Sequence, residues 1–272
     1  MTNRRSDRGR DAATGLGGTA GALARVLRRA ASVGGGLALL SACHHFNPRA
    51  YTNPESLFRA SMREFRAGRF QPAFLGFQKL TFDLPGRDTL APRARFLMAE
   101  CYFGMRDFVT AAREFRRVAD ENPTDAMAPE ALLRAGDAYT QLWRRPELDP
   151  TNGQTALAAY QELQGRFPET RAAAVADARI RALNEDFAAK EYQNALFYFR
   201  RGAYDSAILY FKGLIASYGS ATIVPDAWVK LVRAYHAIGY RDEEQETCAH
   251  LLQYYGTRAD VRQACGNGSL RR

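Results

Sequence analysis

Cys43 has the setting that most suggests covalent chemistry in this chain of 272 residues. It follows an apolar run from Ala30 to Ala42, which is preceded by Arg25, Arg28 and Arg29. A membrane-spanning helix needs roughly 20 apolar residues, so this shorter run is better interpreted as a secretion signal. The thiol at its end could then be modified during export. The alternative is a buried helix with an incidental cysteine.

The residues Leu40, Ser41, Ala42 and Cys43 resemble the bacterial lipobox. In that motif, small residues fit a signal peptidase, and the cysteine thiol receives a diacylglyceryl group before cleavage. We therefore expect residues 1–42 to be a signal peptide and Cys43 to be the first, lipid-bearing residue of the mature protein. Two or three acyl chains, palmitate among them, would attach it durably to a membrane.

The residues on either side of this motif bear on which membrane the protein reaches and on where translation starts. His44 follows the cysteine, where an aspartate would resemble a signal for inner-membrane retention, so we expect the periplasmic face of the outer membrane of a diderm bacterium. Residues 1–24 are polar and rich in Gly and Arg, and the signal would look ordinary if translation began at Leu23 or Val26. An over-called start and a long basic leader both stay open.

The charge of the chain is concentrated in this leader. Residues 1–42 hold seven arginines and two aspartates, which account for five of the nine net positive charges. Only about four remain on the mature part, and no motif for recognising bases is present. We therefore expect no nucleic acid partner.

Catalytic and metal chemistry lack suitable residue patterns. Carboxylates such as Asp120, Glu121 and those of residues 242–244 have the spacing of solvated helix faces, and no Ser, Cys or His is paired with a base. His236 and His250 are isolated, so no metal site is expected. We expect neither enzymatic activity nor a cofactor, apart from the covalent lipid on Cys43.

Three cysteines remain after the proposed cleavage. Cys101 lies in an apolar helical run and is expected in the core. Cys248 and Cys265 could form a disulfide in an oxidising compartment after export, but the spacing alone leaves their pairing open.

A recurring helix-turn-helix phrase supplies the strongest information about fold. The stretch "YFGMRDFVTAAREFRRVADENP" has the spacing of a tetratricopeptide repeat at Tyr102, Phe108, Ala111, Phe115, Val118 and Pro123. The small Ala lets two helices approach, the aromatic residues fill the gap between helix pairs, and the proline ends the second helix.

Four further repeats are recognisable. The first contains Ala73 and Phe77, and the fourth contains Ala207 and Phe211, in the equivalent places. The third fits only with about eight residues inserted within "WRRPELDPTNGQ". The fifth has Glu244 where Ala is expected, which we attribute to a terminal capping repeat whose outer face meets water.

The segment between Pro168 and Gly202 contains neither Gly nor Pro and predicts one long helix, interpreted as a stiff spacer. The predicted fold is all-α, a solenoid of about five helix pairs with one long linking helix, and a generic helical bundle is the alternative. The predicted boundaries are a tether at 43–52, repeats one to three at 53–168, the long helix and repeats four and five at 169–257, and a tail at 258–272.

The order of these features resembles the BamD family, lipoproteins of the outer-membrane β-barrel assembly machinery. The resemblance covers residues 52–256 and includes the tether "HHFNPRAYTN", the inserted third turn and the phrase "ALAAYQELQGRFPET". It implies a periplasmic scaffold that binds the barrel protein BamA, joins other lipoproteins of the machinery and helps receive unfolded outer-membrane proteins. The alternative is another exported repeat lipoprotein, for example one that coordinates cell-wall synthesis with the outer membrane.

The resemblance implies two binding regions. The C-terminal repeats would contact BamA, and we expect the residues Tyr192, Phe199, Arg200, Arg233 and His236 on the first-helix face, while Tyr210 stands on the second helix where proteobacterial relatives have an Arg. For the two aromatic residues of the long helix, a role in the core is the alternative.

The N-terminal repeats would form a groove for extended peptide ends. The expected groove positions are Phe58, Met62, Phe65 and Arg66 in repeat one, and Arg93, Phe96, Glu100 and Phe103 in repeat two. Aromatic and Met side chains suit apolar anchors, and Arg66 with Arg93 could receive a terminal carboxylate. The alternative is that the aromatics only fill the gap between helix pairs.

Overall fold

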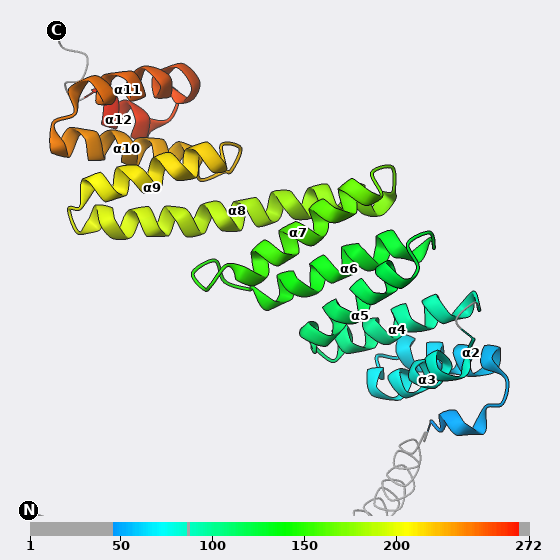
Figure 1. The fold of residues 1–272 in the computed structure, drawn as a ribbon. Coiled ribbons are helices and arrows are strands. Elements are labelled where there is room, and N and C mark those ends of the chain that lie inside the picture. Colours follow the sequence, from blue (N-terminus) through cyan, green and yellow to red (C-terminus); the bar gives the residue numbers. More distant parts are fainter. Residues whose placement is uncertain (1–45, 86–87, 267–272) are drawn as a thin grey trace, which may run out of the picture. The chain divides into compact units, whose positions relative to one another are not determined.

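The computed structural model describes residues 46–85 and 88–266, and every regular element within them is a helix (Figure 1). The chain divides into two units, Met1–Asn47 and Pro48–Arg272, and the helices described below belong to the second. The expected signal peptide and the expected lipid site at Cys43 lie outside the described residues.

The helices pack in chain order, each against the next. The first helices of successive pairs also contact one another, α4 with α6, α6 with α8 and α8 with α10. This is the pattern of a repeat solenoid, and it confirms the predicted fold class. The elements are η1 (Pro48–Ala50), α2 (Pro54–Arg66), α3 (Phe70–Asp83), α4 (Leu90–Gly104), α5 (Phe108–Glu121), α6 (Met127–Leu142), α7 (Thr151–Arg166), α8 (Arg171–Arg200), α9 (Tyr204–Ser217), α10 (Val224–Ile238), α11 (Arg241–Tyr255) and α12 (Ala259–Gly266).

Several of these helices have an N-cap residue whose side chain bonds to the first turn. Asn53 precedes Pro54, and its Oδ1 accepts hydrogen bonds from the backbone N–H groups of Glu55 and Ser56. Thr170 caps the long helix α8 in the same way, with its Oγ1 accepting from the N–H of Ala173. These caps satisfy donors that a helix start leaves without an intrahelical partner.

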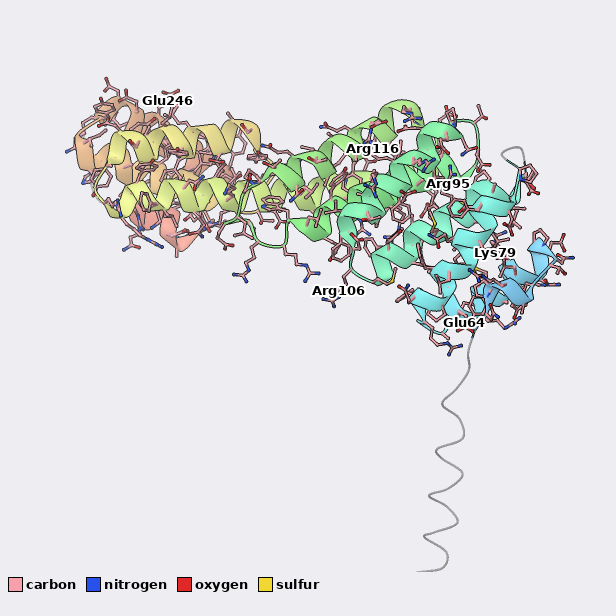
Figure 2. The ribbon with its side chains drawn as sticks, turned by 60° about the horizontal axis from the view of Figure 1, so that its bottom comes forward. Glu64, Lys79, Arg95, Arg106, Arg116 and Glu246 are labelled. Carbon is pink, nitrogen blue, oxygen red and sulfur yellow. A yellow bond between two sulfur atoms is a disulfide. The ribbon has the colours of Figure 1, made fainter. Side chains whose placement is uncertain are left out.

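The turns between the two helices of a repeat contain residues in the left-handed backbone conformation. Gly68, Gly202 and Gly239 have φ angles of 71°, 74° and 80°, and each lies shortly after the first helix of a pair. Glycine adopts this region without steric cost. Arg106 occupies the same place between α4 and α5 with a φ of 65°, and its side chain projects away from the helices (Figure 2).

The repeat positions form the core. Ala73, Ala111, Ala156 and Ala207 are fully buried, as are the aromatic residues four positions later in each repeat. A buried side chain of that size contributes roughly 1.5–3 kcal/mol through removal of apolar surface from water. The core therefore follows the spacing that defines the repeat.

The inserted third turn is tied to the long helix. It connects α6 to α7, and Trp143 at its start is buried with its ring 4.6 Å from that of Phe187. Lys190 of α8 donates hydrogen bonds to the carbonyl oxygens of Glu147 and Leu148 at 3.4 and 2.9 Å. The insertion is thus a fixed part of the solenoid.

Helix α8 is one continuous helix of 30 residues, as predicted. Its first half, which we expected to be a spacer, instead packs into the N-terminal core through Ala176 and Leu183, whereas Ala195 and Leu196 join the C-terminal core. A helix longer than its neighbours can belong to two successive cores, so α8 links the two groups of repeats by packing.

The C-terminal end departs from expectation in two ways. The expected tail contains α12. Cys248 and Cys265, whose pairing the spacing left open, form a disulfide that joins α11 to α12. Glu244, expected to face water, is only 3% exposed. Its burial is possible because Arg241 Nη1 donates to Oε2 at 3.1 Å and His236 Nδ1 lies 3.0 Å from Oε1.

Candidate functional site

The first-helix face, formed by α2, α4, α6, α8 and α10, contains most of the predicted binding residues. At its N-terminal end, Phe58 is half-buried, and its ring lies 5.8 Å from the ring of Phe77. The guanidinium carbon of Arg93 lies 5.3 Å from the centroid of the Phe58 ring. The structure therefore joins an aromatic residue of repeat one to a cation of repeat two.

The other positions of repeat one are divided between core and surface. Phe65 is half-buried, and its ring lies 5.6 Å from that of Phe70 and 6.4 Å from that of Phe77. Met62 is also half-buried, whereas Arg66 is exposed at the end of α2. The aromatic residue thus fills space within its own helix pair, and no recorded contact between described residues joins Arg66 to Arg93.

Phe96 is the clearest correction in repeat two. We expected it to face the groove, but it is 8% exposed, and its ring lies 5.3 Å from that of Phe115. The side chain faces α5 of its own repeat, because burial of a full aromatic ring in the core is favourable. Phe96 is therefore a core residue.

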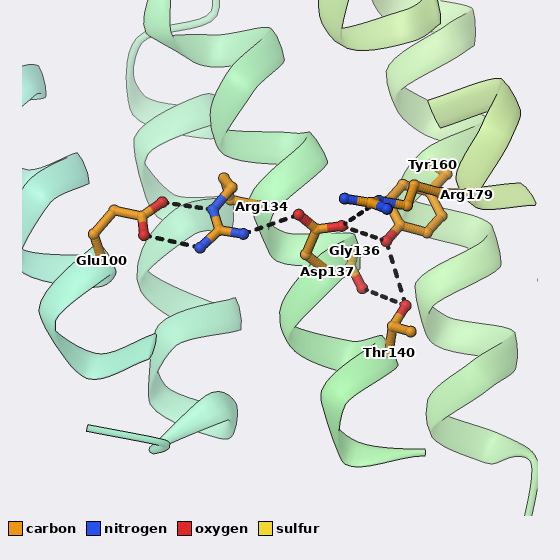
Figure 3. Close-up of polar contacts among 7 residues, drawn as sticks. All are labelled: Glu100, Arg134, Gly136, Asp137, Thr140, Tyr160 and Arg179. Atoms are coloured by element: carbon orange, nitrogen blue, oxygen red, sulfur yellow. Dashed lines mark hydrogen bonds and ion pairs between the residues drawn. The ribbon is translucent and has the colours of Figure 1, made fainter. Parts of the chain in front are cut away.

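Glu100 lies instead in a polar network that continues into repeat three (Figure 3), and the ring of Phe103 lies against the arginine of that network. Arg134 of α6 donates to both carboxylate oxygens of Glu100, at 2.5 and 2.8 Å, and to Asp137 at 2.9 Å. Its guanidinium carbon lies 4.1 Å from the centroid of the Phe103 ring. Such bidentate pairing fixes the arginine in one orientation.

Asp137 is the centre of the network. The hydroxyl of the buried Tyr160 donates to its Oδ1 at 2.9 Å, and Arg179 Nε of α8 donates to the same oxygen at 3.1 Å. Burial, followed by the negative charge of Asp137, raises the pKa of the Tyr160 hydroxyl, so it stays protonated and remains a donor. Thr140 Oγ1 lies 3.3 Å from the same hydroxyl.

A cavity of about 250 Å³ opens beside this network, between α4, α6 and α8. Arg179 is 52% exposed at its edge, and among the described residues only its Nε has a partner, so its outer amines are open to a ligand. Burial raises the pKa of Asp186, which also lines the cavity. The cavity can therefore hold a side chain of a bound peptide between an arginine and a carboxylate.

This cavity was not predicted from the sequence, although a signal for it is present there. Tyr139 occupies in repeat three the place of Tyr102 in repeat two. The same offset carries Glu100 to Asp137 and Phe103 to Thr140, and both of these residues of repeat three line the cavity. Extending the predicted groove by one repeat would have found them.

The C-terminal part of the face brings together three predicted residues. Burial and the negative charge of Asp226 raise the pKa of Tyr192, while the positive charges of Arg200 and Arg233 act in the opposite direction. Tyr192 is half-buried, with its ring 5.8 Å from that of Phe211. The positive charges of the two arginines therefore act on one partly accessible tyrosine.

Phe199 and His236 flank this group. The ring of Phe199 lies 5.4 Å from that of Tyr204 and 5.4 Å from Lys230 Nζ, so it is partly core and partly covered by a cation. His236 and Arg233 line a hollow of about 270 Å³ between α10, α11 and α12. These contacts leave His236 exposed.

Tyr210 lies in a different cluster. Its ring stacks on that of Tyr198, with centroids 5.1 Å apart and planes 14° apart. Beside it, Arg201 covers the ring of Phe197, with the guanidinium carbon 4.1 Å from the centroid. Tyr198, Phe197 and Arg201 were not predicted from the sequence as part of a binding surface.

Successive helix pairs that pack through buried alanines define a tetratricopeptide-repeat protein. The first helices of these pairs form one face, on which most of the predicted binding residues lie. A solved tetratricopeptide protein of Thermus thermophilus has a TM-score of 0.36 at 17% identity, and the match covers 79% of this chain and 98% of that protein. The repeat domain of P58(IPK) has a TM-score of 0.41 at 14% identity, and the match covers 78% of this chain and 54% of that protein. The fold class itself rests on the helix pairs described above.

Residues 51–251 match the family model of the YfiO outer-membrane lipoproteins, and the chain belongs to this family, which includes BamD. A protein of Caulobacter vibrioides named outer membrane protein assembly factor BamD is 32% identical over 103 residues, which are 38% of this chain and 34% of the relative. The protein of the same name from Rickettsia prowazekii is 21% identical over 178 residues, which are 65% of this chain and 70% of the relative.

The alignments with the first curated relatives cover only part of those proteins. The first curated relatives are matched over 34% of their own length, so activity and partners are proposals for this chain. The family is one of assembly factors, which agrees with the expectation that the chain is not an enzyme. No helix among residues 46–85 and 88–266 is long and apolar enough to cross a membrane.

Proposed function

We propose that this chain is a lipid-anchored scaffold of the machinery that assembles β-barrel proteins in the outer membrane. Cys43 carries the lipid at the periplasmic face, the C-terminal repeats bind a BamA-like barrel protein, and the N-terminal repeats receive unfolded barrel proteins. The observation that carries the proposal is the family match, which covers residues 51–251, from the first repeat into the second helix of the fifth. The relatives named BamD favour it over a scaffold for cell-wall synthesis.

The chemistry of the first-helix face supports receipt of an extended peptide. Phe58 beneath Arg93 offers an apolar contact next to a cation, and the cavity beside Asp137 offers a second pocket one repeat away. Arg134 is already bound to Glu100 and Asp137. A terminal carboxylate would therefore be bound by Arg93 or by the outer amines of Arg179.

The C-terminal cluster supports docking of a folded partner. The positive charges of Arg200 and Arg233 act on the half-buried Tyr192, and tyrosine and arginine are among the residues that most often dominate binding energy at interfaces. The other lipoproteins of the machinery would then join the assembly formed by this pair.

Capture of the BamA-like partner from detergent-solubilised membranes tests the proposal. With the tagged full chain as bait, Arg200→Glu with Arg233→Glu should reduce capture about tenfold without loss of helicity in circular dichroism. The control is Arg59→Glu with Arg181→Glu, which makes the same charge change at exposed positions of α2 and α8. Undiminished capture by the first variant would exclude this interface and direct attention to Tyr210.

The anchor is tested separately. Cys43→Ala should abolish metabolic labelling with palmitate and release the protein from outer-membrane fractions, because no acyl chain would remain. Cys101→Ala is the matched control, since that thiol is buried in the core. Unchanged labelling of the Cys43→Ala variant would contradict the assignment.

A further inference from the structure

A hollow between the second helices of repeats four and five lies apart from the first-helix face. It has a volume of about 350 Å³. Its floor belongs to α10 and its two walls to α9 and α11. The residues that line it are Trp228, Leu231 and Tyr235 on the floor, Lys212, Ile215 and Ala216 on one wall, and Glu243, Glu246, Thr247 and His250 on the other.

The floor of this hollow is apolar and aromatic. Leu231 and Tyr235 are buried, and the half-buried Trp228 has its ring 4.7 Å from that of His250. The ring of His250 in turn lies 4.8 Å from that of Tyr254, which is 63% exposed. An aromatic row thus leads from the floor to the solvent along α11, a surface suited to an apolar side chain.

The α11 wall is acidic. Glu243 and Glu246 are exposed, and Glu246 projects outward from the C-terminal repeats (Figure 2). Burial, followed by these two carboxylates, raises the pKa of the Tyr235 hydroxyl, which places both charges near the floor. The chain as a whole carries a net positive charge, so this acidic edge is a local feature.

The corresponding gap between repeats two and three is closed. There, Arg116 of α5 pairs with Glu162 of α7 at 2.7 Å, and Arg166 of α7 pairs with Asp120 of α5 at 3.2 Å. Between α9 and α11, by contrast, no ion pair joins the walls within the part of the chain that the structure describes. The charged groups of this hollow are therefore available to another molecule.

We propose that this hollow docks a segment of a partner protein in which an apolar anchor residue is flanked by Lys or Arg. The anchor contacts Trp228 and Leu231, and the flanking cations pair with Glu243 and Glu246. Charge complementarity selects this occupant, because an acidic segment would be repelled from the α11 wall. The site goes beyond the proposed BamA interface, which uses the other side of α10 at Arg233 and His236.

The test uses a labelled synthetic peptide, Lys-Lys-Leu-Ala-Lys-Leu-Leu-Lys-Ala-Leu-Lys-Lys, titrated with the full chain at low salt and followed by anisotropy. A companion peptide has Glu at every Lys position. We expect the basic peptide to bind and the acidic one not to bind. Glu243→Lys with Glu246→Lys should weaken binding about tenfold, and Ala216→Arg, which fills the hollow from its exposed wall, should weaken it similarly.

The control is Glu55→Lys with Glu130→Lys, which makes the same change in net charge at exposed positions of α2 and α6. It should change the affinity less than about threefold, because those carboxylates lie on other repeats. Equal weakening by the control, or equal binding of both peptides, would overturn the proposal. Self-association of the full chain that the Glu243 and Glu246 reversal abolishes would also overturn it, since the occupant would then be a second copy.

Discussion

Gly136 lies so close to the ring of Tyr160 that a Cβ atom on residue 136 would be 2.3 Å from the ring atom Cε1. Tyr160 is fully buried, and its hydroxyl is held by Asp137, so the ring cannot move aside without loss of that hydrogen bond. The close approach of α6 and α7 therefore fixes the wall of the cavity on the first-helix face.

Gly136→Ala should consequently destabilise the protein by about 2–4 kcal/mol, because the added methyl group overpacks the core. Urea denaturation measures the change in free energy of unfolding. Gly165→Ala in helix α7 is the control, since a Cβ there meets nothing within 4 Å, and it should stabilise by up to about 1 kcal/mol. Equal stability of the two variants would contradict the packing described.

Arg106 offers a second test of the fold, because it is the one described non-glycine residue with a positive φ. Arg106→Gly should raise the free energy of unfolding by about 1 kcal/mol, since left-handed backbone strains a residue with a Cβ. Gly202→Ala makes the opposite change in the equivalent turn and should lower the free energy of unfolding by a similar amount. Denaturant midpoints of both variants check the sign, and a destabilising Arg106→Gly would show that the side chain has a stabilising role.

The disulfide between Cys248 and Cys265 should stabilise the C-terminal cap. It closes a loop with a sequence separation of 17, for which chain entropy gives about 3 kcal/mol. Cys265→Ser should lower the unfolding temperature in oxidising buffer, and a reducing agent should lower that of the wild type but not that of the variant. If reductant leaves the wild-type melting curve unchanged, the disulfide does not contribute to stability.

Arg93 and Arg66 should contribute unequally to peptide binding at the N-terminal groove. A peptide that ends in an aromatic residue should bind weakly and with marked salt dependence, and Arg93→Glu should lower its affinity about tenfold, because Arg93 lies over Phe58. Arg66→Glu should have a smaller effect, since Arg66 is exposed at the end of α2. Titration at low salt checks this, and unaltered binding by the double variant would remove the site.

The sequence predicted those features that local spacing determines. Ala111 and Phe115 mark a helix pair because every repeat needs a small and a large residue at these places, and the inserted third turn follows from the interrupted spacing. The pairing of Cys248 with Cys265 stayed open, because it depends on where α12 folds back.

Features that depend on the rotation of a helix were not predictable in the same way. Phe96 and Glu100 lie on one helix at a spacing of four, yet one packs on Phe115 and the other binds Arg134 of the next repeat. Glu244 is buried because Arg241 donates to it and the imidazole of His236 on the preceding helix lies within hydrogen-bond distance of it. Such contacts join residues whose proximity only the packed structure determines.

The most direct test of the proposed function is depletion of this chain in its native cell, followed by measurement of folded β-barrel proteins in the outer membrane. Folded barrels migrate differently from unfolded ones in gels of unheated samples, which gives the folded fraction. The scaffold proposal predicts that folded barrels decline and unfolded forms accumulate as the chain is lost, and that the wild-type chain restores them while Arg200→Glu with Arg233→Glu does not. Unchanged levels of folded barrel proteins after depletion would contradict it.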